Sequence, residues 1–421
     1  MIRKFLPYFI GICVLAYLVK QATGDGDFKV FLEAAKLVNS GENPYQKWIY
    51  IKEGHSCLYF YSPLWAILLI PFTHLPNFIP NLIWLLFNVW CLYRIGKLLV
   101  HYLDLELVSE RQLQWILTLT FLLNLRFILY NFSLIQLTIF LLWGSLESIR
   151  LFREQKYIRG GMLLALIINI KILPIVLLPY LLYRNEWKSF VSCLLFLVVF
   201  LFLPAVIIGW DFNTLLYQSW WGTINPSNEE HLLETGLGPH SLTALIPTLL
   251  TPTIGEINLP RNILSLSESS AILVMNCIRL CLVSLTIYFL RWPPFKNAGS
   301  RMKELYELSY LFLLVPLVFP HQQKYAFVFM IPAVFYTSAF MVCLYESDDK
   351  STKKLFQWLR FPAMLFFVCT TLTTDGLIGK ELNQISQHFK IVTYGALVLI
   401  LLLVICRPTL FTISTTRKKT S

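Results

Sequence analysis

The sequence predicts an all-α integral membrane protein, a polytopic helical bundle of about 10 to 12 transmembrane helices. Of its 421 residues, 56% are hydrophobic and only 14% are charged, whereas a soluble domain is about 25% charged. Apolar runs of about 15 to 22 residues recur along the chain, the length a helix needs to cross a bilayer core of about 30 Å. These runs do not alternate as strands would, and a helix satisfies its own backbone in lipid, so we expect helices.

The formal net charge of +11 comes from basic residues that flank the apolar segments, and it does not indicate a nucleic-acid partner. Basic clusters occur within 150–159, 350–360 and 417–419. Lys and Arg concentrate in cytoplasmic loops, and anionic lipid headgroups attract them. The nine cysteines form no Cys-x-x-Cys pair, which predicts free thiols rather than a disulfide framework.

The first apolar segment, 5–20, follows Arg3 and Lys4 and is predicted to be a retained helix. A signal peptide is the alternative, but no small-x-small cleavage site follows the segment. With the N-terminus inside, loop 21–57 is the first extracytoplasmic loop. The next predicted segments are 58–72, 78–100, 112–130 and 132–149, followed by 160–183, which Lys171 and Pro174 break into two short helices.

The second half of the chain continues the same alternation. A segment at 188–208 leads to a large extracytoplasmic loop, 209–270, and 271–290 returns. Two hairpins follow, with segments 305–319, 325–345, 357–373 and 390–406, and the chain closes on a basic cytoplasmic tail, 407–421. Residues 1–421 are thus predicted to be a single polytopic domain of the cell membrane, with both termini cytoplasmic.

Arg94, Lys97 and Arg111 conflict with this topology. Their charge also predicts a cytoplasmic position. The two apolar stretches between 58 and 93 would instead return the chain to the outside. Either one stretch is re-entrant or the charge rule fails locally.

The first outer loop contains two carboxylates, in the run Gly24-Asp25-Gly26-Asp27. Apolar residues at helical spacing then predict an interfacial helix over 28–39. Asp27 stands directly before it, where a carboxylate caps a helix and complements its dipole. The flanking glycines also allow other groups to approach closely. We therefore expect Asp27 to be an N-cap, a catalytic base, or both, with Asp25 as the alternative base or a ligand for a divalent metal.

Lys171 lies inside an apolar run, where a charge costs about 2.5–3.5 kcal/mol on insertion scales. Snorkelling to the outer interface offsets that cost, and so does an anionic partner such as a phosphate. The turn at His321, Gln322 and Lys324 presents an imidazole, an amide and an ammonium together. That set suits a phosphate or sugar hydroxyls.

Other polar groups gather in the predicted outer loops. His240 and Ser241 precede a short apolar stretch, 242–250, whose helical N-terminus would suit an anion. Tyr61 belongs to an aromatic belt or to a platform for a sugar or a prenyl chain, and Gln136 lies in a polar turn between two segments. We expect Tyr61, Gln136, His240, Ser241 and Gln322 to contact substrate.

The chain contains no Walker loop, no Gly-x-Ser-x-Gly, no His-Glu-x-x-His and no Cys/His metal cluster, motifs that would each indicate a different chemistry. No cofactor is predicted, and a divalent metal is not excluded.

Taken in order, the remaining motifs resemble glycosyltransferase family 87. This family of polytopic C-class enzymes includes the mycobacterial polyprenol-phosphate-mannose-dependent α-1,2-mannosyltransferases. Ile135-Gln136 stands where the family often has Gly-Gln, His240 departs from a common Asn-Gln-Ser-Leu, and Gln322 replaces the second histidine of a Pro-x-His-His turn. The motifs that carry the resemblance are Asp27-Phe28-Lys29-Val30, Ala34-Ala35, Gly41, Asn43-Pro44-Tyr45, Tyr61-Ser62-Pro63-Leu64, Gly160-Gly161 through Lys171 to Pro174, Pro239-His240-Ser241-Leu242 and Pro320-His321-Gln322.

The resemblance implies a C-class glycosyltransferase-like fold and a polyprenyl-phosphate sugar donor, with mannose as the family default. It also implies a glycolipid or glycan acceptor on the extracytoplasmic face and Asp27 as the base. The leaving phosphate needs cations rather than an acid, and Lys171, His321 and Lys324 are the candidates.

Two other classes of protein fit parts of the pattern. A transporter or flippase of lipid-linked saccharides would also hold charges in the membrane, and it predicts paired intramembrane acids and bases. A non-catalytic assembly subunit would not need Asp27.

Overall fold

The computed structural model describes residues 2–52, 55–103, 108–228, 231–291, 294–296, 298–347 and 349–408. Residues 409–421 of the predicted basic tail lie outside the described residues. Helices dominate the described chain, and its one sheet is a hairpin of β1 (Ile49–Lys52) and β2 (His55–Cys57). The predicted all-α membrane class is confirmed.

The chain divides into two compact units. The first unit comprises residues 1–95, 129–175 and 187–225, and the second comprises 96–128, 176–186 and 226–421.

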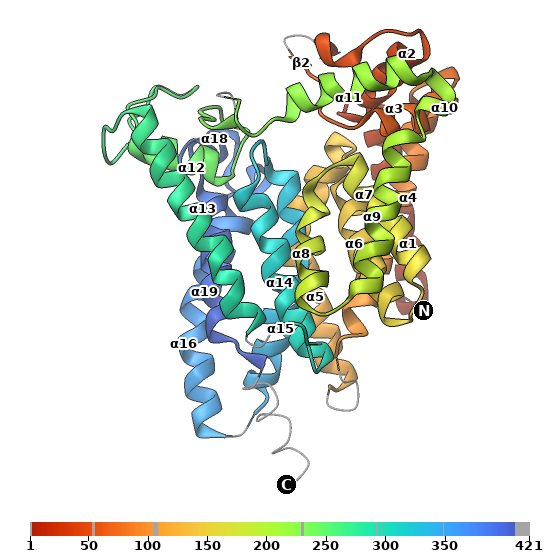
Figure 1. Cartoon of the computed structure of the whole chain (residues 1–421). Coiled ribbons are helices and arrows are strands. Elements are labelled where there is room, and N and C mark those ends of the chain that lie inside the picture. Colours follow the sequence, from red (N-terminus) through yellow and green to blue (C-terminus); the bar gives the residue numbers. More distant parts are fainter. Residues whose placement is uncertain are drawn as a thin grey trace. The chain divides into compact units, whose positions relative to one another are not determined.

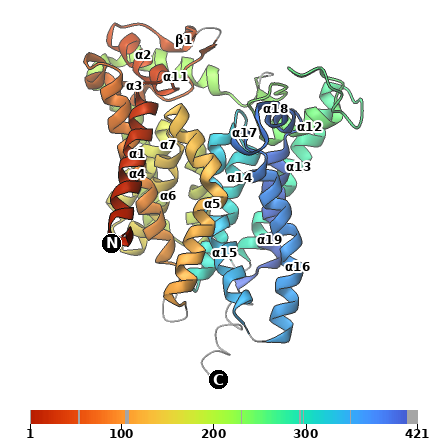
Figure 2. The same cartoon turned by 180° about the vertical axis from the view of Figure 1, so that it is seen from behind.

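The first unit combines long apolar helices with a layer of short ones. Figures 1 and 2 show α2, α3 and α11 at one end of α1, α4, α6, α7 and α9. Small residues let the long helices approach closely, because a Cβ added to Gly161 would lie 2.2 Å from Ser192 Oγ. The helices of this unit are α1 (Ile2–Ala22), α2 (Phe28–Asn39), η1 (Pro44–Gln46), α3 (Pro63–Leu69), η2 (Ile70–His74), α4 (Phe78–Val100), α6 (Thr138–Arg153), α7 (Tyr157–Ile170), α9 (Trp187–Phe202), α10 (Ala205–Ile208) and α11 (Trp210–Ile224).

The second unit is built around α14 and α15, whose side chains are almost all buried. A buried ion pair between Arg184 and Glu307 joins α14 to the end of α8, and Arg184 also donates to the Leu290 carbonyl at 2.5 Å. The helices that begin in this unit are α5 (Glu110–Leu134), α8 (Leu177–Tyr183), α12 (Leu242–Leu250), α13 (Glu268–Leu290), α14 (Arg301–Val318), η5 (Lys324–Met330), α15 (Ile331–Tyr345), α16 (Lys350–Phe367), the π-helix η6 (Val368–Leu372), α17 (Asp375–Ile378), α18 (Lys380–His388) and α19 (Ile391–Ile405).

Six helices of the described chain are long and apolar enough to cross a membrane, or seven if the bent pair of α18 and α19 is one span. Shorter apolar helices at 11–22, 63–74, 157–170 and 173–183 accompany them. The total of about 10 to 12 crossings stays a prediction.

Several predicted elements are confirmed locally. The predicted helices over 28–39 and 242–250 are α2 and α12. The predicted break occurs at Lys171, between α7 and η3 (Leu173–Val176). The boundary between 112–130 and 132–149 is wrong, because α5 continues to Leu134.

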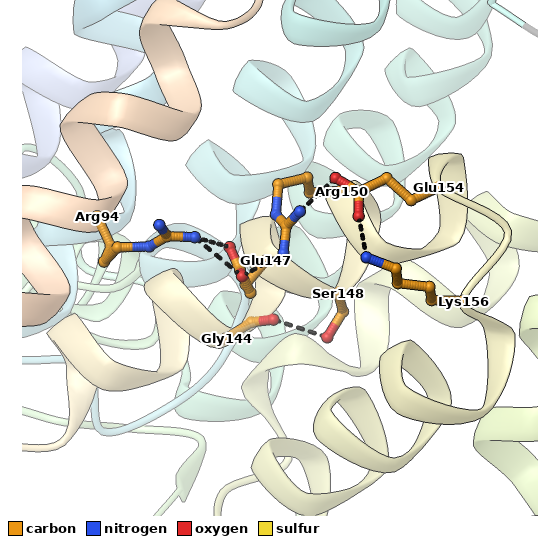
Figure 3. A network of polar contacts seen from close by, with 7 residues as sticks. All are labelled: Arg94, Gly144, Glu147, Ser148, Arg150, Glu154 and Lys156. Carbon is orange, nitrogen blue, oxygen red and sulfur yellow. Dashed lines mark hydrogen bonds and ion pairs between the residues drawn. The ribbon is translucent and has the colours of Figure 1, made fainter.

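The prediction of a crossing at 58–72 is wrong, and this removes the topological conflict. α3 and η2 together contain 12 residues, about 20 Å of helix, which is too short for a core of about 30 Å. A single long helix, α4, then leads to Arg94. Figure 3 shows Arg94 paired with Glu147, which also pairs with Arg150. The basic residues at 94 and 150 therefore lie on the same side, as their charge predicts.

Candidate active site

The first loop is anchored on the turn between α5 and α6. The backbone N–H of Asp27 donates to the Leu134 carbonyl at 2.8 Å. A Cβ on Gly26 would lie 2.8 Å from the same oxygen, which is closer than a side chain tolerates. Glycine at position 26 is therefore what lets the two backbones meet.

The carboxylate of Asp27 does not cap α2. Asp27 occupies the N-cap position with φ −62° and ψ −18°, but its side chain makes no capping hydrogen bond. The side-chain amide of Gln136 donates instead to Asp27 Oδ2. The prediction that Asp27 acts through a side-chain cap is wrong, and the carboxylate belongs to a polar cluster with the α5–α6 turn.

Gln136 is buried, and both its backbone and its side chain form hydrogen bonds. It is 2% exposed, its N–H donates to the Asn131 carbonyl at 2.9 Å, and its own carbonyl accepts from Trp84 Nε1 at 3.1 Å. Its Oε1 accepts from the Tyr61 hydroxyl at 3.3 Å. The amide thus joins Asp27 to Tyr61 in one orientation.

Ile135, which precedes it, adopts φ 53°. The left-handed region costs an L-residue about 1–2 kcal/mol, and it is exceptional for a β-branched side chain. The side chain is 1% exposed, so burying it offsets this strain.

Lys171 completes the cluster from the end of α7. Its backbone is extended there, and its ammonium donates to the Tyr61 hydroxyl at 3.4 Å and lies 5.0 Å from the centre of the Tyr61 ring. Burial lowers the pKa of Lys171 to about 8, against the opposing charge of Asp27. Asp27, Gln136, Tyr61 and Lys171 therefore form one site in the first unit, which we call the Asp27 cluster.

Asp25 lies in a different environment. Its side chain is 53% exposed and forms an ion pair of 3.2 Å with Lys29, whose ammonium also donates to the Ile51 carbonyl at 2.7 Å. The two carboxylates of the first loop thus have different partners.

The segment at 209–225 contains a helix, α11, where the sequence predicted only part of the large loop 209–270. α11 contacts the first loop, where Asn43 donates to Ser219 Oγ at 2.8 Å and Trp220 Nε1 donates to the Phe60 carbonyl at 3.1 Å. Trp220 therefore binds the backbone directly before Tyr61. In the sequence, the adjacent pair Trp220-Trp221 was the one indication that this part of the loop packs against the protein.

The remaining predicted residues meet in the second unit. The His321 N–H donates to both oxygens of Glu234 at 3.0 and 3.1 Å, and His321 Nδ1 lies 2.6 Å from the same carboxylate. His231 contacts the other ring nitrogen of His321. Ser241 donates to Glu234 at 3.1 Å. Burial opposes ionisation of Glu234, but the contacts with His321 and Thr243 hold its pKa below the usual value.

Next to this group, the His240 N–H donates to the Gln322 carbonyl at 2.8 Å. The Gln322 side chain donates to the Pro320 carbonyl at 2.5 Å, and Lys324 donates to Gln387 Oε1 at 3.0 Å. The structure thus brings together His240, Ser241, His321, Gln322 and Lys324. Sequence reasoning missed Glu234 and His231, because a single acid and a single histidine in a loop form no pattern.

Among the residues that the structure describes, no three His, Cys, Asp or Glu side chains are grouped so that they could hold a metal ion.

The comparison with known families identifies the chain. The model of glycosyltransferase family 87 matches residues 59–320. The match includes Tyr61, Gln136, Lys171 and His240; Asp27 precedes it, and it ends one residue before His321. No curated protein and no solved structure matches the chain. Since more than half of the sequence matches the family model, the chain belongs to glycosyltransferase family 87 and is a membrane glycosyltransferase.

Proposed function

We propose that this enzyme transfers a sugar, with mannose as the family default, from a polyprenyl-phosphate donor to a hydroxyl of a glycolipid or glycan on the extracytoplasmic face. The observation that supports this reaction most directly is the Asp27 cluster. It places a carboxylate and an ammonium in one site, joined through Gln136 and Tyr61. Such a pair supplies both a base and a cation for a leaving phosphate.

The proposed step is a single displacement. The acceptor oxygen attacks the anomeric carbon as its proton passes to Asp27, and the bond from that carbon to the phosphate oxygen breaks with its electron pair going to the phosphate. General-base catalysis contributes about 10²–10⁴-fold. Lys171 stabilises the charge that grows on the phosphate in the transition state. One displacement inverts the anomeric configuration.

The partners of each carboxylate support Asp27 over Asp25 as the base. A base must hold a fixed orientation toward its substrate, and the Gln136 amide fixes one oxygen of Asp27. Asp25 is more than half exposed, and its partner is the ammonium of Lys29, in a surface ion pair of a type that holds its side chains only weakly. We assign Gln136 and Tyr61 to the positioning of Asp27 and Lys171, in addition to substrate contact.

His321 and Lys324 remain proposed ligands of the donor phosphate, and His240, Ser241 and Gln322 remain proposed substrate contacts. A transporter would predict paired acids and bases in the membrane. The buried pair of Arg184 and Glu307 is of that kind, but Arg184 is also bonded to the Leu290 and Lys296 carbonyls. An arginine bonded in this way to a carboxylate and two backbone carbonyls is typical of a structural contact between helices.

The proposed function is tested by measuring sugar transfer directly. Purified protein is incubated with radiolabelled polyprenyl-phosphate mannose or polyprenyl-phosphate glucose and a glycolipid acceptor. We expect a labelled product of inverted configuration from one donor. A product of retained configuration would exclude the single displacement. Movement of intact donor across a vesicle without any product would exclude catalysis.

A further inference from the structure

A groove runs along the first unit where α7 and α9 lie side by side (Figure 1), and its volume is about 620 Å³. The two helices touch at Ser192, whose hydroxyl donates to the Tyr157 carbonyl at 2.9 Å. A Cβ added to Gly161 would lie 2.2 Å from the same hydroxyl oxygen, so the glycine is what allows this close approach. On α9 the groove is lined by Lys188, Val191, Ser192, Leu195, Phe196 and Val199.

The lining residues of α9 form a stripe that covers about half the thickness of a membrane. The helix rises about 16 Å from Lys188 to Val199 at 1.5 Å per residue, and a bilayer core is about 30 Å thick. Val191, Leu195 and Val199 are exposed within the candidate span Trp187–Ile208, so lipid covers them. The length fits the chain of a lipid in one leaflet, whereas a transmembrane helix of a partner would need a stripe along the whole span.

One end of the groove is polar, and we call this end, formed by Tyr157, Trp187 and Lys188, the mouth. The Lys188 ammonium lies 5.5 Å from the centre of the Tyr157 ring, and no carboxylate of the described residues forms an ion pair with it. Trp187 is half exposed. Lysine, tyrosine and tryptophan are the residues that gather at the headgroup level of a membrane. A cationic, aromatic mouth followed by an apolar stripe has the same polarity as an anionic phospholipid.

Further positive charge lies near the mouth, where α6 ends and α7 begins. Figure 3 shows the basic side chains of this region that pair with Glu147 and Glu154. Arg159 and Lys188 are exposed and lie outside that network. Their charge attracts an anionic headgroup and disfavours the quaternary ammonium of a zwitterionic one.

The mouth is also remote from the Asp27 cluster. Tyr157 is the first residue of α7, and Lys171 directly follows its last. The helix between them rises about 20 Å. A donor whose phosphate lies at Lys171 therefore does not place that phosphate at Lys188, and the groove requires a different lipid.

We propose that this groove binds one anionic phospholipid, with its phosphate at Lys188 and an acyl chain along the apolar stripe of α9. The ammonium donates to a phosphate oxygen in a charge-assisted hydrogen bond. The acyl chain fills the open side of the groove and supplies the packing contacts that the lining lacks there. The lipid belongs to the leaflet on the far side of the membrane from the Asp27 cluster, so it binds independently of sugar transfer.

The proposal is tested by measuring lipid binding to the full-length protein without turnover. Purified protein in detergent is mixed with phosphatidylglycerol or phosphatidylcholine of identical chains, and bound lipid is counted by native mass spectrometry at several lipid concentrations. Lys188→Gln removes the charge at the mouth, and Arg159→Gln removes a charge outside the groove as its control. Leu195→Trp fills the groove, and Leu194→Trp makes the same change on the adjacent residue of α9, which does not line it.

We expect wild-type protein to retain one phosphatidylglycerol in preference to phosphatidylcholine. Lys188→Gln should weaken this binding about fivefold, which corresponds to the contribution of about 1 kcal/mol by one basic residue near an anionic lipid. Leu195→Trp should weaken the binding of both lipids, whereas Leu194→Trp and Arg159→Gln should stay within about twofold of wild type, since an exposed charge outside the groove is screened. Thermal unfolding shows whether each variant is folded, and the charge variant and the filling variant test the site separately if one of them is not.

Equal retention of the two lipids by wild type would overturn the assignment to an anionic headgroup, and wild-type affinity in Lys188→Gln would overturn its position. Equal effects of Leu195→Trp and Leu194→Trp would overturn the groove as the place of the chain. A dimer that Leu195→Trp dissociates would assign the groove to a second copy, and displacement by polyprenyl phosphate at equal concentration would assign it to the donor lipid; either result overturns the proposal. Because the binding assay contains no sugar donor, its outcome does not depend on the proposed transfer reaction.

Discussion

Replacing Asp27 with asparagine removes one negative charge and keeps an acceptor oxygen for the Gln136 amide. The backbone bond from residue 27 to the Leu134 carbonyl is unaffected by the change. Side-chain size is also nearly the same. The substitution therefore isolates the charge and basicity of this carboxylate from its structural role.

The magnitudes separate catalysis from folding. A hydrogen bond to a charged group contributes about 1.5–3 kcal/mol and a neutral one about 0.5–1.5 kcal/mol. The Gln136 contact therefore weakens by about 1 kcal/mol. Loss of a general base costs about 10²–10⁴-fold in rate, or about 3–5 kcal/mol of transition-state stabilisation. We expect transfer to fall at least a hundredfold while the variant stays folded.

Asp25→Asn is the matched control, because it makes the same chemical change two residues away. Asp25 contributes an exposed ion pair with Lys29, and such pairs contribute about 0–1 kcal/mol. We expect near wild-type transfer. Both variants are purified in parallel, checked by size-exclusion chromatography and thermal unfolding, and assayed with the same labelled donor. Near-normal turnover by Asp27→Asn, or loss of turnover in Asp25→Asn alone, would refute the assignment.

Three further changes follow from the structure. Because the pKa of Lys171 is lowered to about 8, its cationic form is lost as pH rises through that value; transfer should fall on that alkaline limb, and Lys171→Arg, which stays charged, should shift the limb to higher pH in a pH-rate profile. Gly26→Ala places a Cβ 2.8 Å from the Leu134 oxygen, so thermal unfolding should show a loss of about 1–3 kcal/mol; an unchanged midpoint would contradict the close approach. The pKa of Glu234 is lowered in the folded protein, so its stabilisation is present above the unfolded value of about 4.3 and is lost as pH falls through the folded value; Glu234→Gln should be less stable than wild type at neutral pH, and the difference should shrink in acid, as unfolding at several pH values will show.

The helical elements were predictable where their signal is local. The apolar stripe over 28–39 and the polar break at Lys171 depend only on residues within a few turns of each other. The crossing at 58–72 was mispredicted for a related reason. Hydropathy is similar for a full span and for a short helix that ends at a turn, and only the helix length in the fold distinguishes them.

The partners of the site residues had no such signal. Gln136 and Asp27 are 109 residues apart, and His321 and Glu234 are 87 apart. A hydrogen bond between distant side chains leaves no periodic trace in either segment. The polar turn at Gln136 predicted a substrate contact, whereas the fold makes it a partner of Asp27.

The helical membrane class and the family resemblance both followed from the chain read alone, because apolar burial and short motifs are properties of consecutive residues. The fold decided which of two neighbouring carboxylates meets the Gln136 amide, and it decided that Glu234 meets His321. Those outcomes depend on how helices pack against one another, and packing determines distances that no spacing along the chain encodes.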